Sequence, residues 1–137
     1  MKLQVLFLCT GNSCRSQMAE AWAKRLRGDF LEAWSAGTHP KNVDPLAIRA
    51  MLEHGIDIST GRPKNVKDLL AVPFDLVVTV CDAASQECPI FPGKARIVHR
   101  GFDDPPRLAA ASRTDEERMA PYRRVCLEIR DYVLTLP

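Results

Sequence analysis

Hydrophobic residues follow two spacings along the chain, and stretches with the two spacings alternate. Short apolar runs rich in strand formers predict strands over 3–8, 30–35, 74–80 and 95–99. Apolar residues three or four positions apart predict helices over 16–27, from 45 to about 55, and from 115 toward the C-terminus. Strands that alternate with helices are typical of a small α/β domain with a largely parallel sheet, whose ligands bind at the carboxyl ends of the strands.

Residues with known capping preferences mark where the helices begin. Asp44 and Pro45 supply an N-cap carboxylate and a proline in the first turn. Thr114 opens a capping box that Glu117 completes. Pro121 falls inside the last helix, so this helix either kinks there or has its main body begin there.

The composition is that of one globular domain. The chain has 137 residues, of which 46% are hydrophobic and 26% charged. The net charge of +2 argues against a dedicated nucleic-acid binder, which would show a basic block. No apolar run approaches the roughly 18 residues of a membrane span, and the apolar stretch over 3–9 lacks the cleavage site of a signal peptide. We therefore expect one cytoplasmic domain over residues 1–137, without a nucleic-acid or membrane partner.

The cysteines are the residues whose number calls for an explanation. An odd count without a secretion signal argues against a disulfide framework, and their spacing lacks the elements of a zinc site. Cys126 falls on the apolar face of the last helix and is expected to be a core residue. The five positions are Cys9, Cys14, Cys81, Cys88 and Cys126.

A short loop joins Cys9, at the end of the first predicted strand, to Arg15, where the helix begins. A crossing from strand to helix turns successive backbone N–H groups toward one point, and the helix N-terminus adds positive charge there. Gly11 and Asn12 tolerate the positive φ angles that such a nest requires. The guanidinium of Arg15 matches two oxygens of a tetrahedral oxyanion.

In that setting we expect Cys9 to be a thiolate with a lowered pKa and to act as the nucleophile. Ser16 is expected to donate a hydrogen bond to its sulfur, whereas the Cys14 thiol is expected to have no catalytic role. An inert cysteine at the end of a buried strand is the alternative. The predicted oxyanion-binding residues are Thr10, Gly11, Asn12, Ser13, Cys14, Arg15 and Ser16.

The segment Val5–Ser16, with the sequence VLFLCTGNSCRS, resembles the phosphate-binding loop of the low-molecular-weight protein tyrosine phosphatases and of the arsenate reductases built on that fold. Ser35–Thr38 and Asp103–Pro105 resemble two further landmarks of the family, so the resemblance runs from residue 3 to the last helix. It implies a three-layer α/β domain with a four-stranded parallel sheet flanked by helices. A monomer is expected.

Phosphate and arsenate share shape and charge, so the loop alone does not separate a phosphatase from a reductase. Reduction of arsenate takes two electrons, which two thiols supply by forming a disulfide. Cys81 ends the third predicted strand at the same sheet edge as Cys9, and Cys88 can then attack Cys81 and move the disulfide outward. On a helix these two positions are about 10.5 Å apart along the axis, whereas a disulfide needs Cα atoms within roughly 4.4–6.8 Å. The segment between them would therefore have to loop out.

The segment from Cys81 to Pro89 also resembles the redox segment of thioredoxin-coupled arsenate reductases. The resemblance implies arsenate as substrate, phosphate or sulfate as analogues, and thioredoxin as electron donor. Asp104 stands where the family has its general acid, and Asp103 is the weaker candidate. The predicted catalytic residues are Cys9, Arg15, Cys81, Cys88 and Asp104.

Two other functions compete with this interpretation. The first is a phosphatase acting on phosphotyrosine or small aryl phosphates, with weak phosphatase activity also compatible with the reductase. The family's phosphatases usually have aromatic residues after their Asp-Pro, where this chain has Pro106-Arg107-Leu108. The second is a non-enzymatic thiol site for arsenite, which would leave Arg15 and the nest without a purpose.

The remaining polar motifs predict no further site. Some reductases of the family bind potassium beside the loop through an acidic residue, in a region where this chain has Gly61-Arg62-Pro63-Lys64. We therefore expect neither a metal ion nor another cofactor. His39, His54 and His99 are scattered without evident partners, so we expect exposed or structural roles for them.

Overall fold

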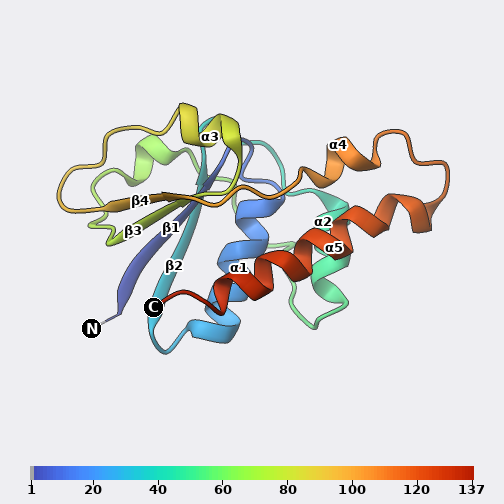
Figure 1. Ribbon diagram of the computed structural model, residues 1–137, viewed down its shortest axis with the longest axis horizontal. Coiled ribbons are helices and arrows are strands. Elements are labelled where there is room, and N and C mark those ends of the chain that lie inside the picture. Colours follow the sequence, from blue (N-terminus) through green and yellow to red (C-terminus); the bar gives the residue numbers. More distant parts are fainter. Residues whose placement is uncertain (1) are drawn as a thin grey trace.

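The computed structural model describes residues 2–137 and has a four-stranded parallel sheet at its centre (Figure 1). The strands are β1 (Leu3–Cys9), β2 (Leu31–Gly37), β3 (Leu76–Thr79) and β4 (Arg96–His99). Their order is β2-β1-β3-β4, and every neighbouring pair is parallel. The predicted parallel α/β sheet is confirmed, and β3 lies inside it whereas β4 is an exposed edge strand.

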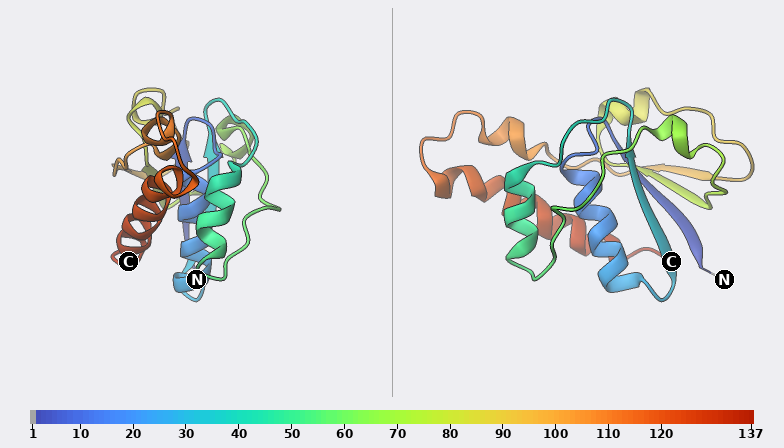
Figure 2. Two further views of the ribbon diagram at one scale, coloured as in Figure 1. Left: turned by 90° about the vertical axis from the view of Figure 1, so that its right-hand side faces the viewer. Right: turned by 180° about the vertical axis from the view of Figure 1, so that it is seen from behind.

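Helices and loops cover both faces of the sheet. All four side chains of residues 5–8 in β1 are fully buried, although alternate residues point to opposite faces. On one face α1 packs against β1, β2 and the long C-terminal helix α5 (Figure 2). On the other, Trp34, Phe74 and Phe91 form a chain of edge-to-face aromatic contacts. The helices are α1 (Arg15–Arg27), α2 (Pro45–Leu52), α3 (Asp82–Gln86), α4 (Pro105–Ala109) and α5 (Asp115–Val133), with a 3-10 turn η1 (Val66–Leu69).

The capping residues act as the sequence predicts. The Asp44 carboxylate accepts a hydrogen bond of 2.9 Å from the backbone N–H of Leu46, and the Thr114 hydroxyl accepts one of 3.1 Å from that of Glu117. Helix α5 continues through Pro121, so its main body does not begin at the proline.

Three short helical elements, α3, α4 and η1, lie outside the sequence prediction. Asp104 has the extended backbone expected before a proline, with φ −90° and ψ 104°, but Pro105 then begins α4. Strands β3 and β4 are shorter than the apolar runs that predicted them. Among residues 2–137 no helix combines the length and the apolar composition that a membrane crossing requires.

Candidate active site

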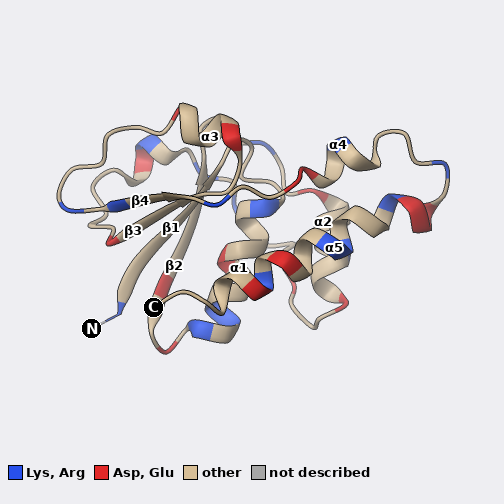
Figure 3. Ribbon diagram, in the orientation of Figure 1, with Lys and Arg blue, Asp and Glu red and all other residues tan. Residues whose placement is uncertain are grey.

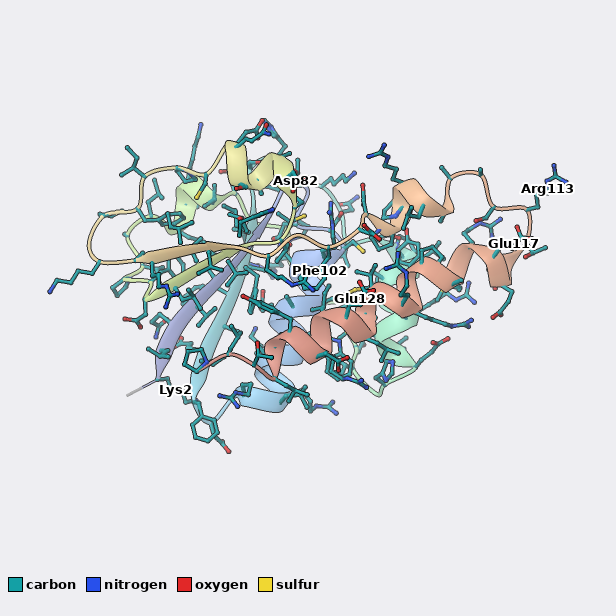
Figure 4. The ribbon with its side chains drawn as sticks, in the orientation of Figure 1. Lys2, Asp82, Phe102, Arg113, Glu117 and Glu128 are labelled. Carbon is teal, nitrogen blue, oxygen red and sulfur yellow. The ribbon has the colours of Figure 1, made fainter. Side chains whose placement is uncertain are left out.

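A cavity of about 840 Å³ opens at the carboxyl ends of β1 and β3. Its walls come from the loop before α1, the start of α3 and the segment between β4 and α4; Asp82 and Phe102, labelled in Figure 4, belong to two of these walls. Parallel strands end at one sheet edge, which is why residues about 70 positions apart meet there. The predicted site residues that line the cavity are Cys9, Thr10, Gly11, Ser13, Cys14, Arg15, Cys81 and Asp104.

Hydrogen bonds to its backbone carbonyl groups hold the loop after Cys9 in place. Each carbonyl from residue 9 to residue 14 accepts a hydrogen bond from elsewhere, four of them from backbone N–H groups of the segment 38–44. A peptide whose carbonyl points outward presents its N–H on the opposite side. The backbone therefore forms the concave, N–H-lined surface that binds a tetrahedral anion. The donors are, in order, the backbone N–H groups of Thr38, His39 and Lys41, the side chain of Gln17, and the backbone N–H groups of Asp44 and Met18.

Asn12 supplies the left-handed residue of this loop, with φ 49°. Its side chain is buried, donates to the Ser16 hydroxyl at 2.9 Å and accepts from the backbone N–H of Lys64 at 2.8 Å. Gly11 lacks the positive φ that the sequence suggested. A Cβ there would lie 2.8 Å from the far end of the Lys41 side chain, which is flexible enough to move aside.

Ser16 and Asn12 therefore support the loop from behind and do not line the cavity. In the structure the Ser16 hydroxyl accepts a hydrogen bond from Asn12. The sequence had suggested instead that Ser16 donates one to the Cys9 sulfur. Gly37, at the end of β2, packs closely against the same loop. A side chain has no room there, because a Cβ would lie 2.4 Å from the Thr10 carbonyl oxygen.

Arg15 connects the loop to the opposite wall. One of its terminal nitrogens donates to the Phe102 carbonyl at 2.9 Å, and the other lies 3.6 Å from the Asp104 carboxylate. Its buried Nε has no partner among the residues that the structure describes. Figure 3 shows the basic start of α1 near the acidic segment that precedes α4. The Phe102 contact is made by a backbone carbonyl, which no side-chain pattern reveals.

The two acidic residues of that segment point to different partners. Asp104 faces Arg15, whereas Asp103 pairs with Arg124 of α5 at 2.8 Å. Asp104 therefore remains the better-placed candidate for an acid beside a bound oxyanion.

The thiols of Cys9 and Cys81 influence each other's pKa. Interaction with Cys9, together with a hydrogen bond of 3.3 Å between the Thr10 hydroxyl and the Cys81 sulfur, lowers the pKa of Cys81. Interaction with Cys81, together with burial, raises the pKa of Cys9, although Arg15 acts in the opposite direction. The direction for Cys9 is opposite to the lowered pKa that the sequence suggested.

The remaining cysteines lie apart from this pair. Cys88 is half-buried beyond α3, and burial raises its pKa. Cys14 is buried at the loop, and burial likewise raises its pKa. Cys126 is a core residue, as predicted, with its thiol 3.4 Å from the Met51 sulfur.

Two of the three histidines have partners that the sequence did not reveal. His99 lies 3.0 Å from the Asp82 carboxylate, and His39 lies 3.3 Å from that of Glu87. Both partners belong to the segment between Cys81 and Cys88.

The region where a potassium site was considered holds a lysine. The ammonium of Lys64 lies 3.9 Å from the Glu20 carboxylate and donates to the Arg62 carbonyl at 2.8 Å. Glu20 also accepts a hydrogen bond from the Ser35 hydroxyl. Within residues 2–137, no cluster of three or more His, Cys, Asp or Glu side chains is arranged to hold a metal ion.

Known proteins share both the sequence and the fold. The family model for low molecular weight phosphotyrosine protein phosphatases matches residues 4–132. An arsenate reductase of Halalkalibacterium halodurans is 48% identical over 134 residues, which cover 98% of this chain and 94% of that protein. The structure of an arsenate reductase in the phosphate-binding state aligns with a TM-score of 0.72 at 28% identity and covers 100% of both chains. The thioredoxin-dependent arsenate reductase of Corynebacterium glutamicum aligns with a TM-score of 0.68 at 28% identity, over 97% of this chain and 59% of that one.

Proposed function

The chain belongs to the low molecular weight phosphotyrosine protein phosphatase family, and we propose that it reduces arsenate to arsenite by a cysteine relay that thioredoxin regenerates. The observation that carries this proposal is the second thiol. Cys81 and Cys9 line the same cavity, and their thiols interact there. A phosphatase needs one nucleophilic thiol, whereas a two-electron reduction needs two.

The first step joins arsenate to Cys9. The N–H-lined loop and Arg15 hold the oxyanion, and Cys9 gives its proton to the neighbouring Cys81. The negative charge is then on Cys9, beside Arg15 and the start of α1. The Cys9 sulfur attacks arsenic, an As–O bond breaks, and Asp104 protonates the departing oxygen so that it leaves as water.

The second step is the reduction. Cys81 gives its proton to an oxygen of the arsenic group, attacks the Cys9 sulfur and forms a Cys9–Cys81 disulfide. The electron pair of the broken S–As bond stays on arsenic, which leaves as arsenite. Arsenic gains two electrons, and the two sulfurs lose two.

The third step moves the disulfide out of the cavity. The Cys88 thiolate attacks the Cys81 sulfur, and Cys9 leaves as a thiolate ready for another cycle. Cys88 does not line the cavity, so the new Cys81–Cys88 disulfide lies nearer to an external dithiol. The two thiols of thioredoxin reduce it and become a disulfide themselves.

A coupled assay tests the proposal directly. The reduced protein is mixed with thioredoxin, thioredoxin reductase and NADPH, and arsenate is added. NADPH consumption should begin with arsenate, saturate, and disappear in Cys9→Ser and in Cys81→Ser. Arsenate-independent consumption, or an unchanged rate in Cys81→Ser, would contradict the relay.

We further propose that residues 1–137 act as one cytoplasmic, monomeric domain. One continuous core joins both faces of the sheet to α5, which supports a single folding unit. Sedimentation of the reduced protein at micromolar concentration should give the mass of one chain.

A further inference from the structure

A histidine contacts the redox segment at its N-terminal end. His99, the last residue of β4, lies 3.0 Å from the carboxylate of Asp82 through Nε2. Its other ring nitrogen is 2.9 Å from the Thr79 hydroxyl, on a buried residue of β3. The imidazole therefore bridges the end of the sheet and the first residue of α3.

A second histidine contacts the other end of the segment. His39 lies 3.3 Å from the carboxylate of Glu87, the residue immediately before Cys88. The backbone N–H of His39 donates to the Thr10 carbonyl at 2.8 Å, which fixes this histidine to the anion-binding loop. The two contacts thus join α3 to the sheet at one end and to the loop at the other.

The helix between these contacts has little stability of its own. It spans five residues, far fewer than an isolated helix needs in water. Two hydrogen bonds, from Ser85 to the Cys81 carbonyl and from Glu87 to the Ala83 carbonyl, close its turns. Cys81 lies just before α3 and Cys88 two residues beyond its end, and a disulfide between them needs Cα atoms within roughly 4.4–6.8 Å. Bringing the two cysteines together across the helix would displace its residues, including both carboxylates.

We propose that His39 and His99 are positioning residues that clamp the redox segment in its helical form through their contacts with Glu87 and Asp82. The proposal rests on the relay of Cys81 and Cys88 proposed above. Opening of the segment, and with it formation of the second disulfide, requires both contacts to break.

Few other charged groups face the two histidines. Beside His99, the Arg100 guanidinium points to the Gly101 carbonyl and stacks over the Phe102 ring. Lys41 shares the loop of His39 and lines the same cavity. Cys81, at the N-cap of α3, is a further titratable group nearby. The effect of the histidines is therefore read as the difference in exchange rate between wild type and a variant that lacks both.

Hydrogen–deuterium exchange of the reduced protein, without arsenate or thioredoxin, measures the opening. The reporters are the amides of Ser85 and Glu87. Exposed ion pairs change an equilibrium by about 1.5- to 5-fold each, so His39→Ala/His99→Ala should exchange these amides about 2- to 20-fold faster at pH 6. The matched control is His54→Ala, since His54 packs against Trp22 with a ring-centroid distance of 5.3 Å, and it should exchange like wild type.

A second pair of variants separates the clamp from a general structural role. Asp82→Asn/Glu87→Gln should reproduce the faster exchange, and combining all four substitutions should add little, because both doubles break the same contacts. Equal exchange in wild type and the histidine double variant at pH 6, or fully additive effects, would overturn the clamp. Neither result depends on arsenate chemistry, so failure of the clamp and failure of the proposed reduction are read from different measurements.

The clamp also predicts a shift in redox equilibrium. In dithiothreitol redox buffers at pH 6, the histidine double variant should form the Cys81–Cys88 disulfide with an equilibrium constant about 2- to 20-fold larger than wild type, matching the exchange factor. An equilibrium constant unchanged from wild type would overturn the link between opening and disulfide formation.

Discussion

The thiols of Cys9 and Cys81 interact, so replacing one of them changes the pKa of the other. In Cys81→Ser the nearby negative charge that raises the pKa of Cys9 is lost, while Arg15 still lowers it. The pKa of Cys9 should therefore fall below its wild-type value. The rate of Cys9 alkylation by iodoacetamide, followed against pH by peptide mass spectrometry, measures the shift. An unchanged or higher midpoint would show that Cys81 does not control the Cys9 proton.

Asp104 and Asp103 are adjacent, and their contacts predict different effects of the same substitution. Asp104→Asn keeps the shape beside Arg15 but cannot donate a proton, so single-turnover arsenate consumption should slow by about 10²- to 10⁴-fold. Oxyanion binding, measured by competition with phosphate, should change little. Asp103→Asn is the matched control. It loses an exposed pair with Arg124, and its rate should stay within about 2-fold of wild type. A slow Asp103→Asn and an unaffected Asp104→Asn would identify Asp103 as the general acid instead.

At the scale of elements, the relay makes α3 a switch between two conformations. Cys88→Ser should reduce one equivalent of arsenate, because Cys9 and Cys81 supply two electrons, and should then stop with the Cys9–Cys81 disulfide in the cavity. Wild type oxidised by one equivalent of arsenate should instead carry Cys81–Cys88, with residues 82–87 more sensitive to protease. Non-reducing peptide mapping identifies each disulfide.

The matched control for Cys88→Ser is Cys126→Ala, which removes a core thiol outside the relay. It should keep multiple turnover at temperatures where it remains folded, despite a loss of stability from the cavity it creates. Sustained thioredoxin-driven turnover by Cys88→Ser would remove Cys88 from the mechanism and leave two cysteines.

How much the sequence could predict also depends on the element. The strand, loop and helix around Cys9 could be placed because a run of strand formers, a Gly-Asn pair and helical spacing follow one another over about 20 residues. Helices α3 and α4 span five residues each, too few for a periodic pattern. The contacts of His39 and His99 join residues 48 and 17 positions apart, and nothing in the local sequence reveals them. The same holds for the mutual effect of Cys9 and Cys81 on their pKa values, which depends on how two strand ends meet.

At the scale of the whole molecule, the proposed mechanism combines two separable chemistries. In it, the loop and Arg15 bind a tetrahedral oxyanion and Cys9 supplies the nucleophile, which is all that hydrolysis of a phosphate ester requires together with an acid. Cys81 and Cys88 would add the capacity to accept oxidation. The family's phosphatase chemistry and the proposed reduction therefore share Cys9 and Arg15 and differ in their need for the other two thiols.

This division predicts hydrolysis of p-nitrophenyl phosphate by the reduced protein. The activity should be weak, because Pro106 and Arg107 line the cavity wall after Asp104 where aromatic side chains would hold an aryl ring. It should vanish in Cys9→Ser. In Cys81→Ser it should persist and, below about pH 7, equal or exceed that of wild type, because the lower pKa of Cys9 leaves more thiolate at acid pH. Initial rates of p-nitrophenol release from pH 5 to 8 test these predictions, and circular dichroism confirms that each variant is folded. Loss of hydrolysis in a folded Cys81→Ser would show that Cys81 takes part in the anion chemistry itself, and the separation between the shared nucleophile and the added relay would fail.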